Sequence, residues 1–165
     1  MTDPISEVAV HLPAVAAHYP LSCPLRVRWA EVDAQGVVFN GHYLMYADVC
    51  CTEYFRAAGV PQWSGPAASG KAADTLDYYV VRATLDYKAS ARFDDLLTLR
   101  GRISRLGSSS FTFECRIERE RDGAWLCTAE VISVNAHAGA ARPLPEHFRA
   151  AVLAFESRSQ EQGQS

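Results

Sequence analysis

The pattern of hydrophobic and polar positions divides the chain into one helical segment and a later series of alternating segments. Between residues 40 and 58 the side chains are apolar around most of a helical circumference. The few polar ones fall on one narrow stripe: Asp48, Thr52, Glu53 and Arg56. Such a helix must be buried around most of its surface. Asn40 is suited to cap its first turn, and Gly59, followed by Pro61, is suited to end it.

Three later segments alternate between apolar and polar residues, which predicts strands with one face in a core and one in water; they cover about residues 81–88, 97–104 and 111–118. A further strand is predicted over residues 124–135, which are more continuously apolar and therefore expected to be better covered. An earlier strand is predicted over residues 25–30, where Leu25, Val27 and Trp29 occupy alternate positions. Short hairpin connections, such as Asp122-Gly123, predict antiparallel pairing. We therefore expect an α+β fold in which a curved antiparallel five-stranded sheet is wrapped around one long central helix.

The chain of 165 residues is predicted to form one domain with short extensions. Residues 1–24 contain several prolines and no strong period, and are interpreted as an N-terminal extension. The domain is expected over residues 25–156, with a loop at residues 60–74 and a last helix that opens at Pro145-Glu146. Residues 157–165 are polar and are predicted to form a frayed tail.

Composition and charge exclude several classes of partner. The net charge is −3 and the pI is about 5.9, so no basic signal favours nucleic acid or an anionic membrane. The sequence shows no signal-peptide pattern and no run of eighteen apolar residues, so a cytoplasmic location without membrane contact is expected. The five cysteines form no C-x-x-C pair. They are interpreted as reduced, mostly buried thiols, and no metal site is predicted.

The turn before the long helix carries the main candidate for chemistry, Asp33, in the segment DAQG over residues 33–36. A helix N-terminus presents unpaired N–H groups and the positive end of a dipole. Such donors, directed at a developing oxyanion, can stabilise it by roughly 3 kcal/mol each. A carboxylate a few residues earlier can attack the same carbonyl or activate a water. The alternative reading of Asp33 is structural, because aspartate in such a turn accepts hydrogen bonds from backbone groups.

These residues and their order resemble the hotdog-fold thioesterases, specifically the 4-hydroxybenzoyl-CoA thioesterase family. The resemblance covers about residues 25–151 and is most specific in VRWAEVDAQGVVF (27–39), followed by Tyr43 and TEYFRAAG (52–59). Three later segments resemble the family in the same order: YKASARFDD (87–95), GSSSF (107–111) and RPLP (142–145). The chain departs from the family at Ser90 or Ala91, near where proline is usual, and at Asn40, where some relatives carry an aromatic residue or histidine.

The resemblance implies hydrolysis of an acyl- or aroyl-CoA thioester to the free acid and CoA, without a separate cofactor. It implies that Asp33 is the nucleophile or general base and that amides around Asn40, Gly41 and His42 polarise the thioester carbonyl. Glu53 is the alternative carboxylate, because a related subfamily uses a glutamate of the helix. The remaining candidates would bind substrate: Gly36, Tyr43, Lys88, Arg92 and Ser109. Gly36 lets the backbone approach the substrate closely, and Lys88 and Arg92 could meet the CoA phosphates or belong to a solvated face.

The resemblance also implies edge-to-edge pairing of two subunits with active sites at the joint, so a homodimer or homotetramer is expected; an unpaired strand edge is a physical reason for such pairing. Two other functions fit the same sequence. A non-catalytic module would bind an acyl thioester intact and would not need Asp33. A hydratase or dehydratase would need an Asp–His pair, for which Asp33 and His42 are the nearest candidates, although they do not form the usual D-x-N-P-x-H pattern. The acyl group and the carrier, CoA or an acyl-carrier protein, stay open.

Overall fold

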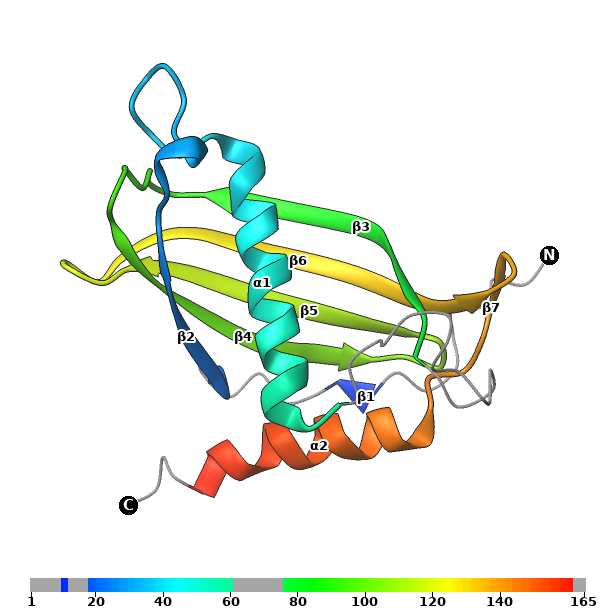
Figure 1. Cartoon of the computed structure of the whole chain (residues 1–165). Coiled ribbons are helices and arrows are strands. Elements are labelled where there is room, and N and C mark those ends of the chain that lie inside the picture. Colours follow the sequence, from blue (N-terminus) through cyan, green and yellow to red (C-terminus); the bar gives the residue numbers. More distant parts are fainter. Residues whose placement is uncertain (1–9, 12–17, 61–75, 162–165) are drawn as a thin grey trace.

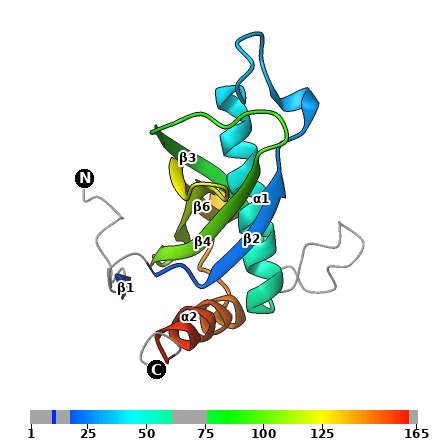
Figure 2. The same cartoon turned by 90° about the vertical axis from the view of Figure 1, so that its left-hand side faces the viewer.

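The structure is a computed structural model that describes residues 10–11, 18–60 and 76–161 (Figure 1). A long helix, α1, lies across one face of an antiparallel sheet, and a second helix, α2, lies near the C-terminal end of α1 (Figures 1 and 2). The elements in chain order are β1 (Val10–His11), β2 (Leu21–Arg26), the 3-10 turn η1 (Trp29–Glu31), α1 (Asn40–Ala58), β3 (Tyr78–Tyr87), β4 (Leu96–Leu106), β5 (Ser110–Arg119), β6 (Ala124–His137), β7 (Ala140–Ala141) and α2 (Glu146–Glu161).

The sheet confirms the α+β class and the antiparallel pairing. Its central order is β4-β5-β6-β3; β1 and β2 both pair with β4, and β7 pairs with the end of β6. The expected number of five strands is wrong for the described residues, which form seven. The two additional strands, β1 and β7, have two residues each, too few for a hydrophobic alternation to show in the sequence. β2 and β3 are the outer long strands, and among the described residues no strand pairs with the outer side of either.

The strands β4 and β5 face the core as their alternation predicted. The buried residues on these strands include Leu97, Leu99, Ile103, Phe111, Phe113, Cys115 and Ile117. Gly101 replaces a side chain at an inward position, and a Cβ there would lie 2.9 Å from Cys50 Sγ and 2.8 Å from the ring of Phe113. Gly101 therefore makes room for α1 to pack closely on the sheet. The cysteines Cys50, Cys51, Cys115 and Cys127 are buried, as expected, while Cys23 is half-buried.

The first long strand starts earlier than predicted. β2 begins at Leu21 and contains Pro24, so it overlaps the part of the chain that was interpreted as an extension. An edge strand tolerates proline, because one side of its backbone needs no hydrogen-bond donor. The predicted strand also ends early: Val27 is buried, but Trp29 lies in η1 with 74% of its surface exposed. The inward alternation therefore does not extend to Trp29.

Helix α1 has the predicted bounds, but its cap and burial differ from the prediction. Gly59 ends the helix in the left-handed conformation, with φ of +74°. Asn40 is not the N-cap: the cap position is Phe39, whose backbone is extended, and Asn40 already belongs to the first turn. The helix is also buried on one side only. Tyr43, Tyr46, Ala47, Cys50, Cys51, Tyr54 and Phe55 face the core, whereas Leu44, Met45 and Val49 are exposed, because the sheet covers a single face of the helix.

The C-terminal part forms a longer helix than the sequence indicated. Phe148 and Val152 are fully buried and Phe155 packs on the core, which confirms the apolar stripe of α2. The helix continues to Glu161, so the predicted frayed tail from Ser157 is helical over its first residues. Most of the predicted loop at residues 60–74 lies outside the described residues. In the part of the chain that the structure describes, neither helix has the length and apolarity needed to cross a membrane.

Candidate active site

Asp33 lies in a tight turn between η1 and α1. Its backbone N–H donates to Val37 O over 2.9 Å, and its own carbonyl accepts from Gly36 N over 2.9 Å. The side-chain atom Oδ1 accepts from Gln35 N over 2.8 Å, which is the structural role that the sequence allowed. Gly36 has φ of +74°, a conformation that residues with a Cβ rarely adopt. The turn therefore fixes the half-buried Asp33 carboxylate on a short loop beside the helix N-terminus.

Glu31 anchors this loop to α1, a role that the sequence analysis missed. Only 4% of its surface is exposed, and its carboxylate accepts from Arg28 N over 2.8 Å and from Tyr46 Oη over 2.7 Å. Its carbonyl accepts from Phe39 N at the start of α1. Burial alone would raise the pKa of Glu31, but the hydrogen bonds from Arg28 and Tyr46 together lower the pKa below its usual value. The only local signal is the capping-box spacing between Arg28 and Glu31.

Two tyrosines hold the other side of the site. Tyr43 Oη accepts from Ala91 N over 2.9 Å, and Val38 N donates to Ala91 O over the same distance, so the loop after β3 is held against the start of α1. Tyr87 Oη donates to Asn40 O over 3.0 Å, and its ring packs edge-on against Tyr43. Burial raises the pKa of Tyr43, which keeps its hydroxyl neutral. Tyr43 thus holds the site by packing on Tyr87 and by accepting a hydrogen bond from Ala91 N. Tyr87 is a further residue of the pocket lining that the sequence did not single out.

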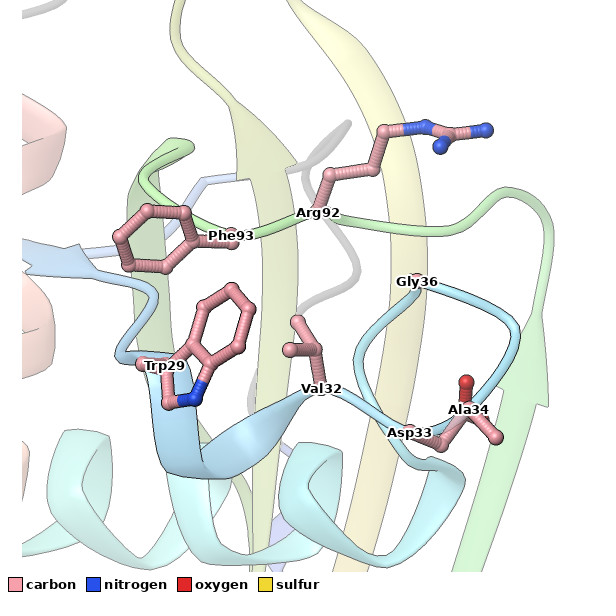
Figure 3. A pocket seen from close by; sticks show the side chains of 7 residues that line it. All are labelled: Trp29, Val32, Asp33, Ala34, Gly36, Arg92 and Phe93. Atoms are coloured by element: carbon pink, nitrogen blue, oxygen red, sulfur yellow. The ribbon is translucent and has the colours of Figure 1, made fainter.

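Two neighbouring pockets share Asp33. The first has a volume of about 410 Å³ and includes Asp33, Asn40, Tyr43, Tyr87 and Lys88 in its lining, so it brings four predicted site residues together. The second, of about 420 Å³, lies on the other side of the loop and includes Gly36 and Arg92 (Figure 3). We call them the helix pocket and the aromatic pocket. Asp33 lies between them, so a ligand that reacts with its carboxylate could extend into both.

The start of α1 supplies backbone donors to the helix pocket. Helix geometry leaves the N–H groups of Asn40 and Gly41 without an intrahelical acceptor. The N–H of His42 donates to Phe39 O over 2.9 Å, so it is the least available of the three predicted donors. Neither Gly41 nor His42 is among the residues that line the two pockets. The imidazole of His42 packs against Phe39, and its Nδ1 is buried without a hydrogen-bond partner among the described residues.

Two predicted site residues lie far from Asp33 in the single subunit. Ser109 lies in the turn between β4 and β5, and its carbonyl accepts from Asn135 N at the end of the sheet opposite to the Asp33 loop (Figure 1). Glu53 lies about 20 Å along α1 from Asn40, at a rise of about 1.5 Å per residue. Its carboxylate pairs with Arg56. The single subunit therefore joins neither residue to the two pockets.

The arrangement around Asp33 suits attack on a polarised carbonyl. Asp33 and Asn40, the first residue of α1, line the same pocket. A carboxylate beside helix N-terminal N–H groups can attack or activate water while those groups stabilise the oxyanion. Lys88 and Arg92 stand on opposite sides of Asp33, and neither forms an ion pair among the described residues. Within those residues no group of three or more His, Cys, Asp or Glu side chains is placed to hold a metal ion.

Comparison with known proteins finds thioesterases. Residues 35–125, more than half of the chain, match the family model described as the thioesterase superfamily. An acyl-CoA thioester hydrolase from Escherichia coli, YbgC, is 30% identical over 111 residues, which cover 67% of this chain and 78% of YbgC. A probable thioesterase from Bartonella henselae has 30% identity and a TM-score of 0.66, over 76% of this chain and 98% of the other.

The fold has a further relative at lower identity. The structure of a 4-hydroxybenzoyl CoA thioesterase has a TM-score of 0.71 and 19% identity, over 80% of this chain and 97% of the other, which shows a common fold. The sheet and its long helix have the hotdog fold, and the thioester-hydrolysing relatives place the chain in that class of enzyme. The chain belongs to the thioesterase superfamily.

Proposed function

We propose that this protein hydrolyses an acyl- or aroyl-CoA thioester to the free acid and CoA, with Asp33 as the catalytic carboxylate. The observation that carries the proposal is that Asp33 and Asn40, the first residue of α1, line the same pocket. The name of the Escherichia coli relative, an acyl-CoA thioester hydrolase, supports the choice of carrier. The thioester carbonyl would lie in the helix pocket, with its oxygen towards the N–H groups of Asn40 and Gly41.

The reaction can take either of two routes through Asp33. As a general base, the carboxylate takes a proton from water while the water oxygen attacks the carbonyl carbon. As a nucleophile, the carboxylate attacks the same carbon and forms a mixed anhydride that water then hydrolyses. In both routes the carbon–sulfur bond breaks and the CoA thiolate leaves and takes up a proton. The helix donors stabilise the negative oxygen of the tetrahedral intermediate in each case.

A second subunit would complete the site, in keeping with the expected homodimer or homotetramer. The outer edge of β3 exposes Tyr79, Val80 and Val81, and an unpaired apolar edge favours pairing with another strand. If two β3 strands pair antiparallel about a two-fold axis, the Tyr78 end of one lies beside the Tyr87 end of the other. The Ser109 turn, which is close to the Tyr78 end through Asn135, would then approach the helix pocket of the partner.

Two observations rank the alternatives below hydrolysis. A hydratase or dehydratase needs an aspartate and a histidine in one pocket, but His42 lines neither of the two pockets that Asp33 lines. A binding module without activity would have no use for a carboxylate placed beside free helix donors. Glu53 remains the alternative carboxylate only if another subunit brings it to the site, because in its own subunit it is far from Asn40.

Release of free thiol from a panel of acyl- and aroyl-CoA esters tests the proposal, with wild type compared to Asp33→Asn. The asparagine amide oxygen can still accept from Gln35 N, so the turn is retained while the charge and basicity are lost. We expect the variant to be at least about a hundredfold slower, which is about 2.7 kcal/mol of transition-state stabilisation. Wild type that binds the esters without releasing thiol would support the binding module. An unimpaired variant would make Asp33 structural, and Glu53 would be changed next.

A further inference from the structure

The aromatic pocket presents an exposed aromatic pair next to the proposed catalytic carboxylate (Figure 3). Trp29 is 74% exposed and Phe93 is 51% exposed, and their rings meet edge to face with centroids 5.3 Å apart. The pair comes from two separate segments, η1 and the loop between β3 and β4. The volume of the aromatic pocket, about 420 Å³, falls within the range of roughly 300–1,000 Å³ that is typical of small-ligand sites.

The exposure of Trp29 is not accounted for by the fold. Leu25 and Val27 of the same segment pack on the core, but the 3-10 turn directs Trp29 away from it. Large aromatic side chains normally bury 150–250 Å², roughly, on folding. Trp29 and Phe93 leave much of this surface free and on the same side of the Asp33 loop. Planar aromatic rings can stack on such surfaces, and nucleobases do so without needing a specific hydrogen-bond pattern.

Arg92 is the cationic group of this pocket, and Asp33 brings a carboxylate to the same lining. The guanidinium of Arg26 pairs with Asp94 and that of Arg28 pairs with Glu31, so these two charges are locally balanced. Arg92, which lines the pocket, forms no ion pair among the described residues. Its planar guanidinium can contact a phosphate through two donors at once. The pocket thus combines a stacking surface with one cation that pairs with no carboxylate among the described residues.

We propose that the aromatic pocket binds the nucleotide end of a CoA thioester, with the adenine against Trp29 and Phe93 and a phosphate against Arg92. This inference rests on the proposed hydrolysis of CoA thioesters and adds the place where the nucleotide of CoA binds. The thioester would lie in the helix pocket, and the pantetheine arm would pass Asp33, which lines both pockets. An acyl-carrier protein bears the same arm without an adenine nucleotide. The enzyme would therefore prefer CoA esters to carrier-protein esters.

The test compares each acyl-CoA with the acyl-pantetheine of the same acyl group, which lacks the nucleotide. The measured quantity is the ratio of kcat/KM for the two substrates, because a general loss of activity cancels in it. We expect Trp29→Ala and Arg92→Gln each to lower this ratio about tenfold, equivalent to about 1.4 kcal/mol, through KM. Trp125→Ala is the matched control, since Trp125 is half-exposed against Arg116, away from both pockets, and should leave the ratio unchanged.

A binding measurement separates failure of the subsite from failure of the hydrolysis proposal. Adenosine 3′,5′-bisphosphate, which carries the base and the ribose phosphate of CoA, is titrated into the full chain by calorimetry, with no reaction required. Binding by wild type that weakens about tenfold in Trp29→Ala supports the subsite, even if no thioester is hydrolysed. No binding, equal binding by both proteins, or an unchanged substrate ratio overturns it. A Trp29→Ala protein that changes its oligomeric mass but not its substrate ratio would make the pocket a subunit contact, which also overturns it.

Discussion

Glu31 provides a test of how the Asp33 loop is held. Its buried carboxylate accepts from Tyr46 Oη and from Arg28 N, and Tyr46 itself is only 1% exposed. In Glu31→Ala both donors lose their acceptor, and a buried donor left unsatisfied costs roughly 1–3 kcal/mol. The ion pair with Arg28 adds little, because that guanidinium is exposed. We therefore expect Glu31→Ala to lower the free energy of unfolding by about 2–3 kcal/mol.

Smaller changes separate the parts of this interaction. Tyr46→Phe removes one donor and leaves the Arg28 contacts, so we expect a loss of about 1 kcal/mol. Glu31→Gln keeps an acceptor oxygen but loses the charge. In that variant the loop would be held less firmly against α1, and we expect kcat to fall about ten- to a hundredfold, since small misplacements of catalytic groups have large effects. Urea unfolding followed by tryptophan fluorescence measures stability, and thiol release measures kcat.

The pH dependence gives a second signature of the same carboxylate. Because the pKa of Glu31 is lowered in the folded protein, its ionised form stabilises the fold above the usual glutamate pKa near 4.5, and this stability is lost as the pH falls through the folded pKa. The stability difference between wild type and Glu31→Gln should therefore shrink in acid. Glu120→Ala, which removes an exposed carboxylate, is the control. The reasoning is refuted if Glu31→Ala unfolds within about 0.5 kcal/mol of wild type, the range expected of a surface substitution.

Three further changes test the core, the second helix and the subunit contact. Gly101→Ala places a Cβ 2.8 Å from the ring of Phe113 and should destabilise by about 1–3 kcal/mol in urea unfolding. Burial raises the pKa of Glu156, so this carboxyl lowers the stability of the fold as the pH rises through its folded pKa. Glu156→Gln, which keeps an acceptor for Tyr54, should therefore be at least as stable as wild type at pH 7 and lose that advantage at pH 4. The reverse order of stabilities would contradict this reasoning. Val81→Lys, on the exposed β3 edge, should convert a dimer to monomers in sedimentation, and a wild type that is itself a monomer would rule out the β3 contact.

The sheet was predictable where one face of a strand is apolar and the other is polar. Phe111, Phe113 and Ile117 lie two or four residues apart, and all three are buried. The end of α1 was predictable because the chain needs a left-handed residue there and Gly59 supplies it at low cost. These features depend on neighbours in the sequence. They can therefore be recognised before any distant contact is known.

The features that the sequence did not show depend on distant contacts. Trp29 continues an apparent alternation, but Glu31 N donates to Arg28 O in a 3-10 turn, which breaks the strand. Glu31 accepts a hydrogen bond from Tyr46, which lies in α1. No local sequence pattern distinguishes such a buried glutamate from a solvated one. Asp33 and Asn40 line the same pocket, and their roles in the chemistry stay a prediction. The division of the surroundings of Asp33 into two pockets was not predicted. One of these pockets is lined by Arg92 and Phe93, which come from a segment distant in the sequence.

The incorrect prediction for α1 is itself informative about assembly. The sequence requires burial around most of this helix, yet one subunit leaves Met45 54% exposed, with Leu44 and Val49 beside it. The same subunit leaves an apolar edge at β3. Exposed apolar groups that cluster on one helix face and one sheet edge are typical of surfaces that another chain covers. The helix pattern and the open edge thus support, by separate arguments, the proposal that a second subunit covers these surfaces.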